Sequence, residues 1–140
     1  MATRGPQAAY GHSRYSEASR AAVYQGLLDE ARHVVLSGRT AILDATYSRR
    51  AWREAALDWA RRHARDAVLI EVAAPRDEVI ARLAARAVAG NDASEAGPGL
   101  YDAMRAEFED PVEWPDTRKA RIDTSAADWR DQVTAAAKRL

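Results

Sequence analysis

The stretch Thr40-Ala41-Ile42-Leu43-Asp44 is a short apolar run that ends abruptly in an aspartate. Its length, and the Gly38-Arg39 pair before it, favour a buried parallel β-strand over a helix. Residues 67–72 repeat the apolar pattern, and residues 121–124 make a last short strand. We therefore expect three short strands, with Asp44 at the carboxyl end of the first.

Segments with helical periodicity separate these runs. Apolar and small residues recur at helical spacing after Ser16, a candidate N-cap, and Gly38 ends that helix. We expect helices over residues 16–37, 49–63, 75–88 and 98–108, and a terminal helix capped by Ser125. Helices that alternate with short apolar strands predict an α/β domain with a parallel sheet, in which ligands bind beyond the carboxyl ends of the strands.

The composition excludes several classes of protein. The chain has 140 residues, 47% of them hydrophobic, with 21 basic and 21 acidic residues. This balance argues against nucleic-acid binding, and no apolar run reaches the length of a membrane span. The absence of cysteine excludes disulfides and thiolate metal sites, and the three histidines lack the spacing of metal ligands. We expect a cytoplasmic protein of one domain.

Asp44 is the first candidate site residue. An aspartate at a strand end can hold Mg²⁺, because this hard ion takes one or two carboxylates together with phosphate oxygens. Thr46, two residues later, could bond phosphate or water. The alternative is that Asp44 only caps the turn into the next helix.

Arg82 and Arg86 form the second candidate group. They lie four residues apart, so they share one face of the predicted helix and could both stabilise charge on a phosphoryl group. The polar residues that follow, 90–99, could close over a nucleotide as a lid. The alternative is a solvated helix face on which Glu78 pairs with Arg82.

Arg53 is the third candidate. It follows the Asp44 strand closely enough to face a second substrate at the edge of the sheet. A charged solvent face of the helix explains it equally well.

Taken together, these motifs resemble a bacterial family of P-loop kinase-like ATP-binding domains. The matching segments are the run from Gly38 to Tyr47, Trp52-Arg53-Glu54, the arginine pair, and Asp92-Ala93-Ser94-Glu95-Ala96. The family is similar to the polynucleotide kinase, gluconate kinase and zeta-toxin group, and its members are often fused to an aminoglycoside-phosphotransferase-like domain. The resemblance covers the chain from about residue 15 onward.

The resemblance implies ATP and Mg²⁺ as cofactors and an unidentified small-molecule acceptor. By it, Asp44 would serve the metal and its water, and Arg82 and Arg86 would contact the nucleotide phosphates. To these we add Thr46 as a nucleotide contact and Arg53 as a substrate contact. Residues 15–140 would be the C-terminal portion of an incomplete three-layer P-loop sandwich, with a lid at about 86–99 and a flexible lead-in at 1–14.

One part of the family pattern is missing from this sequence. No Gly-x-x-x-x-Gly-Lys-Ser/Thr loop occurs, so the glycine cradle and the phosphate-binding lysine are absent. The resemblance also implies a strand before that loop, lying between residues 40–43 and 67–72. The chain would then be inactive until an N-terminal segment complements it. The alternative function is a noncatalytic interaction module that presents the surroundings of Trp52 or Trp114 to a protein partner.

Overall fold

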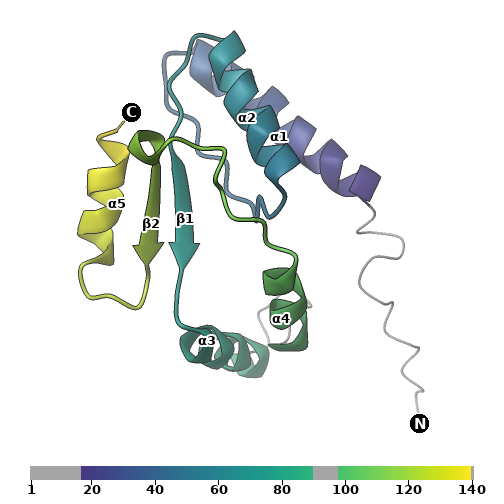
Figure 1. Ribbon diagram of the computed structural model, residues 1–140, viewed down its shortest axis with the longest axis vertical. Helices are drawn as coiled ribbons and strands as arrows, with labels where there is room; N and C mark the ends of the chain where they lie inside the picture. The colour runs from purple at the N-terminus through teal and green to yellow at the C-terminus, as the bar shows by residue number, and fades with distance from the viewer. Residues whose placement is uncertain (1–16, 90–97, 140) are drawn as a thin grey trace. The chain divides into compact units, whose positions relative to one another are not determined.

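The computed structural model describes residues 17–89 and 98–139 of the chain. It has the mixed α/β architecture that the sequence predicts (Figure 1). The elements in chain order are α1 (Glu17–Leu36), α2 (Arg50–Arg62), β1 (Leu69–Ala73), α3 (Arg76–Ala89), α4 (Pro98–Ala106), the short 3₁₀ helix η1 (Asp116–Arg118), β2 (Lys119–Asp123) and α5 (Trp129–Ala137). The chain divides into two units, Met1–Thr46 and Tyr47–Leu140, which are described in turn.

Helix α1 dominates the described part of the first unit. Tyr24, Leu28 and Ala31 are buried, at positions that share one helical face. The helix ends in a Schellman motif, in which the Gly38 amide donates to Val35 O at 3.0 Å and the Arg39 amide donates to Val34 O at 3.3 Å. Gly38 has φ of +80°, as this motif requires. The expected stop at Gly38 is confirmed, while the expected cap at Ser16 lies outside the described residues.

The expected strand at residues 40–43 is wrong. This segment forms no strand, and the Ile42 side chain is 88% exposed. A run of four apolar residues does not form a strand by itself, because a strand needs backbone hydrogen bonds to a neighbouring strand. No neighbouring strand pairs with it in the described part of the chain.

The second unit contains a parallel sheet of two strands, β1 and β2. Leu69 faces Lys119, Glu71 faces Arg121 and Ala73 faces Asp123. The amide of Thr124 donates to Ala73 O at 2.8 Å and so extends the pairing one residue beyond β2. The two later strands expected from the sequence are therefore confirmed, and so is their parallel direction.

The outer edge of β1 lacks a neighbouring strand among the residues described. In a parallel ladder one strand uses alternate residues, so Ala73 and the residues two and four before it turn their backbone groups toward β2. Ile70 and Val72 then direct their N–H and C=O groups to the opposite edge. The Val72 side chain is 68% exposed. The sheet is thus open along this edge of β1.

Helices contact the sheet and one another within the second unit (Figure 1). Helix α5 contacts β2, and Ile122 and Ala136 are each only 1% exposed. Helix α3 begins just beyond the carboxyl end of β1 and contacts α4, where Arg76 and Asp102 pair at 2.7 Å. The predicted helices are confirmed where the structure describes them.

Ser125 does not cap the terminal helix as expected. Helix α5 begins at Trp129, and its N-cap position is Asp128, which makes no side-chain capping bond. Among the described helices, none combines the length and the apolar character needed to cross a lipid bilayer.

Candidate functional site at the carboxyl end of the sheet

Thr124 connects the carboxyl ends of the two strands. Its amide donates to Ala73 O at 2.8 Å, and its hydroxyl donates to the same oxygen at 3.1 Å. It directly follows β2, at the edge where parallel α/β sheets bind their ligands. Thr124 was not among the predicted site residues, although a hydroxyl residue at the end of a predicted strand was a readable signal.

Arg82 reaches this edge from α3. Its Nη1 donates to Thr124 Oγ1 at 3.0 Å and its Nη2 donates to Thr124 O at 3.2 Å. Its Nε donates to Glu78 Oε1 at 3.0 Å, which is the helical pair weighed above as the alternative role. Arg82 therefore makes both sets of contacts at once. Glu78 accepts from Nε of the guanidinium, and Thr124 at the end of β2 accepts from the two terminal nitrogens.

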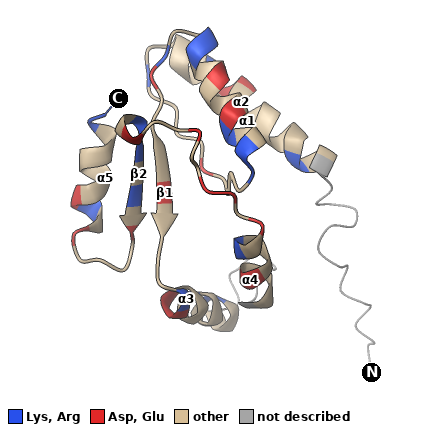
Figure 2. Ribbon diagram, in the orientation of Figure 1, with Lys and Arg blue, Asp and Glu red and all other residues tan. Residues whose placement is uncertain are grey.

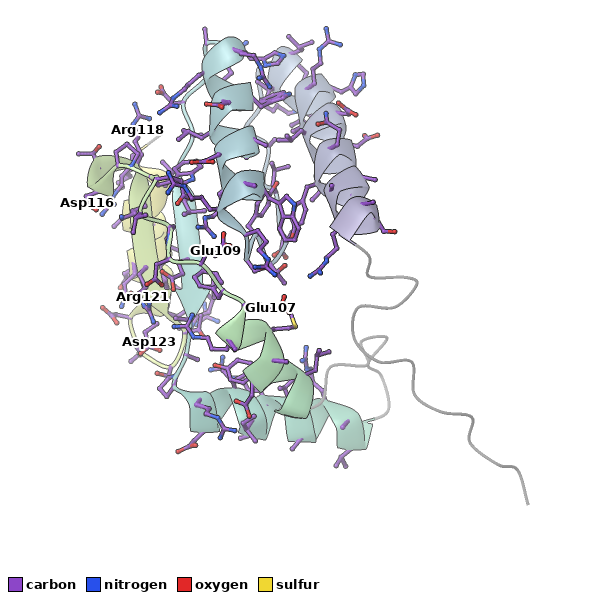
Figure 3. The ribbon with its side chains drawn as sticks, turned by 45° about the vertical axis from the view of Figure 1, so that its right-hand side comes forward. Glu107, Glu109, Asp116, Arg118, Arg121 and Asp123 are labelled. Atoms are coloured by element: carbon purple, nitrogen blue, oxygen red, sulfur yellow. The ribbon has the colours of Figure 1, made fainter. Side chains whose placement is uncertain are left out.

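Asp123 and Ser125 flank Thr124. Figure 3 shows Asp123 at the end of β2, beyond Arg121 on the same strand. Asp123 Oδ1 accepts bonds from the Ser125 hydroxyl at 2.6 Å and the Ser125 amide at 2.8 Å. These bonds lower the pKa of Asp123 below its ordinary value of 3.8, and the charges of Arg121 and Arg82 act in the same direction. The carboxylate is ionised at neutral pH and fixes the turn that presents Thr124.

Arg86 lies one turn after Arg82 on α3 and is exposed. The spacing of four residues places both arginines on one side of the helix. The lid expected at about 86–99 falls mainly on residues 90–97, which are outside the described residues.

Asp44 and Thr46 belong to the first unit, whereas Arg82 and Arg86 belong to the second. Asp44 is exposed. Thr46 Oγ1 shares a hydrogen bond of 2.9 Å with the hydroxyl of Tyr24, a buried residue of α1. Thr46 is thereby tied to the helix of its own unit.

Arg53 is in a different environment from either of those considered in the sequence analysis. Its side chain is 2% exposed, so it lies neither on a solvated helix face nor at an open edge. The guanidinium pairs with Glu113, which is 4% exposed, and also donates to Tyr47 O at 2.9 Å and Asp110 O at 3.2 Å. This network gives Arg53 a structural role that joins α2 to the segment before β2.

The segment over residues 107–113 carries three glutamates and is called here the acidic segment (Figure 2). Arg49 pairs at 3.4 Å with two of them, Glu107 and Glu109. Glu109 also accepts a bond from the Arg50 amide at the start of α2. That bond lowers the pKa of Glu109, and the bond from Arg49 adds to the effect. The arginines at the start of α2 are therefore paired with acids of the same unit.

A concavity of about 430 Å³ lies over the sheet and is bordered by Leu69, Pro111 and Val112. Two ion pairs lie along it: Glu71 bonds Arg121 at 2.9 Å and Asp116 bonds Lys119 at 3.0 Å. The concavity lies over the sheet and includes neither Arg82 nor Thr124. We therefore place the candidate site at the strand end.

The tryptophans considered for a protein interface are largely inside the molecule. Trp52 is 9% exposed and Trp114 is 5% exposed. Their rings therefore belong to the core.

A family model described as an AAA domain matches residues 1–111. Searches of curated proteins and of solved structures gave no match. The matched range contains Asp44, Arg53, Arg82 and Arg86, and it ends before β2 and Thr124.

Proposed function

The chain belongs to the AAA domain family, a family of P-loop, kinase-like nucleotide-binding scaffolds, and we propose that it contributes Asp44, Arg82 and Arg86 to a site for magnesium and ATP. The reaction that we propose is phosphoryl transfer to a small-molecule acceptor. The chain performs it only when a phosphate-binding loop is supplied by another segment, because its own sequence contains none.

The observation that carries this proposal is the position of Arg82. A guanidinium held at the carboxyl end of a parallel sheet lies where this class of fold binds its ligands. Arginine also has the planar fork of donors that suits phosphate oxygens. Arg86, one turn further along the same helix, adds a second charge of the same sign.

The residues present suit the peripheral part of such a site. Mg²⁺ needs only one or two carboxylates when phosphate oxygens and waters complete its shell, and Asp44 is an exposed carboxylate. The ion, when bound, would neutralise charge on the phosphates. In this proposal Asp44 would hold the ion, and Thr46 would donate to phosphate or water after its hydroxyl leaves Tyr24.

Arg82 and Arg86 stabilise the charge of the transferring group from the side of α3. The buried Arg53 supports the substrate side indirectly, because it fixes the start of α2 to the acidic segment. We propose further that residues 86–99 act as the lid.

The open edge of β1 supports the need for a complementing segment. Ile70 and Val72 turn backbone donors and acceptors outward, and an added parallel strand would satisfy them. Two strands are fewer than an independently stable sheet usually needs. A segment that brings both a strand and the phosphate loop would complete the sheet and the site together.

Calorimetric titration with magnesium and ATP tests the proposal. The 140-residue chain is compared with a form extended at its amino terminus by a strand and a Gly-x-x-x-x-Gly-Lys-Ser/Thr loop. We expect binding by the extended form and little or none by the chain alone. Equal binding by both forms, or binding by neither, would contradict the proposal.

A further inference from the structure

We propose that Thr124 is a positioning residue, which fixes the guanidinium of Arg82 so that its remaining N–H groups face an oxyanion at the carboxyl end of the sheet. The class of ligand, a polyphosphate, rests on the proposed function. The fixing of Arg82 rests on geometry alone. Thr124 lies beyond the residues matched by the family model.

The hydroxyl of Thr124 has two tasks that only a hydroxyl can combine. Its single proton goes to Ala73 O at 3.1 Å, which ties β2 to the end of β1. Its lone pair accepts the bond from Arg82 Nη1 at 3.0 Å. Valine has the same shape but could do neither, whereas serine could do both.

Three donors of Arg82 are engaged by these contacts. The guanidinium has five N–H groups in a fixed plane. One on Nε goes to Glu78, one on Nη1 goes to the Thr124 hydroxyl and one on Nη2 goes to the Thr124 carbonyl. One N–H group on each terminal nitrogen remains for a ligand, and the side chain is 46% exposed.

Restricting the Arg82 side chain before a ligand binds should raise the affinity for that ligand. A free arginine side chain loses rotamer entropy when it binds a ligand. Contacts on both sides of Arg82 have already restricted that freedom, and Thr124 supplies two of the three. Removing the hydroxyl should therefore loosen Arg82 without changing its charge.

The test uses the full chain labelled with ¹⁵N and follows the Arg82 Nε–Hε signal by NMR. Arg82→Lys identifies the signal, and Arg61, which pairs with Asp58 on the exposed face of α2, serves as the internal control. We expect Thr124→Val to speed solvent exchange and rotation at Arg82, and Thr124→Ser to restore the wild-type signal. Thr124→Ala replaces the valine variant if the β1 and β2 amide signals show a disturbed fold.

The second readout is a titration of the same proteins with inorganic tripolyphosphate in the millimolar range. We expect Thr124→Val to weaken the response at Arg82 by about fivefold, the equivalent of one hydrogen bond. An unchanged Arg82 signal in Thr124→Val would overturn the positioning role, and so would unchanged tripolyphosphate affinity in a loosened variant. An extended form that binds no ATP while Arg82 stays fixed would instead overturn the proposed function.

Discussion

Nε of Arg53 lies 2.5 Å from Oε1 of Glu113, and both side chains are almost fully buried. The partners are distant in sequence, and backbone carbonyls accept the remaining bonds of the guanidinium. Burying an unpaired charge costs free energy of desolvation, so each of the two side chains offsets this cost for the other. This pair links α2 to the acidic segment within the second unit.

Arg53→Met should destabilise the protein by about 3 kcal/mol, because it leaves the Glu113 carboxylate buried without its partner. Urea unfolding followed by circular dichroism measures the loss. The matched control is Arg61→Met on the same helix, whose pair with Asp58 is exposed, and which should cost less than about 0.5 kcal/mol. Equal losses from the two variants would show that Arg53 does not anchor the segment.

Acid should weaken the fold. Burial raises the pKa of Glu113, but the hydrogen bond from Arg53, a backbone hydrogen bond and the charges of Arg53 and Arg50 together outweigh it, so that the net pKa lies below the ordinary 4.5. A carboxylate with a depressed folded pKa stabilises the protein above its unfolded pKa, and this contribution is lost as the pH falls through the folded value. We expect the free energy of unfolding to decline below about pH 4.5.

Glu113→Gln provides the check on this pH dependence. The variant should be less stable at pH 7 but lose less on acidification, since it has one fewer carboxylate to protonate. Urea midpoints measured between pH 3 and pH 7, on the scale of ordinary carboxyl pKa values, give the comparison. Parallel pH curves for the wild type and the variant would rule out Glu113 as a contributor.

Two glycines of the first unit should respond to alanine in opposite directions. Gly26 lies within α1, and a Cβ added there meets nothing within 4 Å, so Gly26→Ala should stabilise by about 0.5–1 kcal/mol. Gly38 has φ of +80°, so Gly38→Ala should destabilise by about 1 kcal/mol. Thermal unfolding compares the two, and shifts of the same sign would refute the Schellman ending of α1.

Helix α2 ends in the same motif without glycine. Ala64 has φ of +51°, and the Arg65 amide donates to Ala60 O at 3.0 Å. Ala64→Gly should therefore stabilise the protein by up to about 1 kcal/mol, because it relieves the left-handed backbone. A melting temperature that falls in Ala64→Gly would contradict this reading of the helix end.

The helices and the two later strands were predictable from the sequence because apolar and small residues recur at helical spacing in the helices and form short runs in the strands. The strand at residues 40–43 was not, since a strand depends on its neighbour as much as on its own residues. Gly38 was readable as a stop, whereas the end of α2 at Ala64 carries no such signal.

The candidate site was only partly readable. The arginine pair on one helix follows from a spacing of four residues, but the contact from Arg82 to Thr124 joins residues 42 positions apart. The same limit applies to Arg53, whose partner is 60 positions away. The sequence shows which side chains are charged. Only the tertiary fold shows whether a charged side chain contacts solvent or a buried partner.

The central claim is that Asp44, Arg82 and Arg86 serve one nucleotide. Titration of the loop-bearing extended form with magnesium and ATP tests it most directly, with Asp44→Ala, Arg82→Ala and Arg86→Ala beside the parent and Arg61→Ala as the control. The account predicts that each of the three site variants weakens binding by about tenfold or more, the equivalent of a hydrogen bond to a charged group, and that the control does not. Parent-like affinity in all three site variants would contradict it.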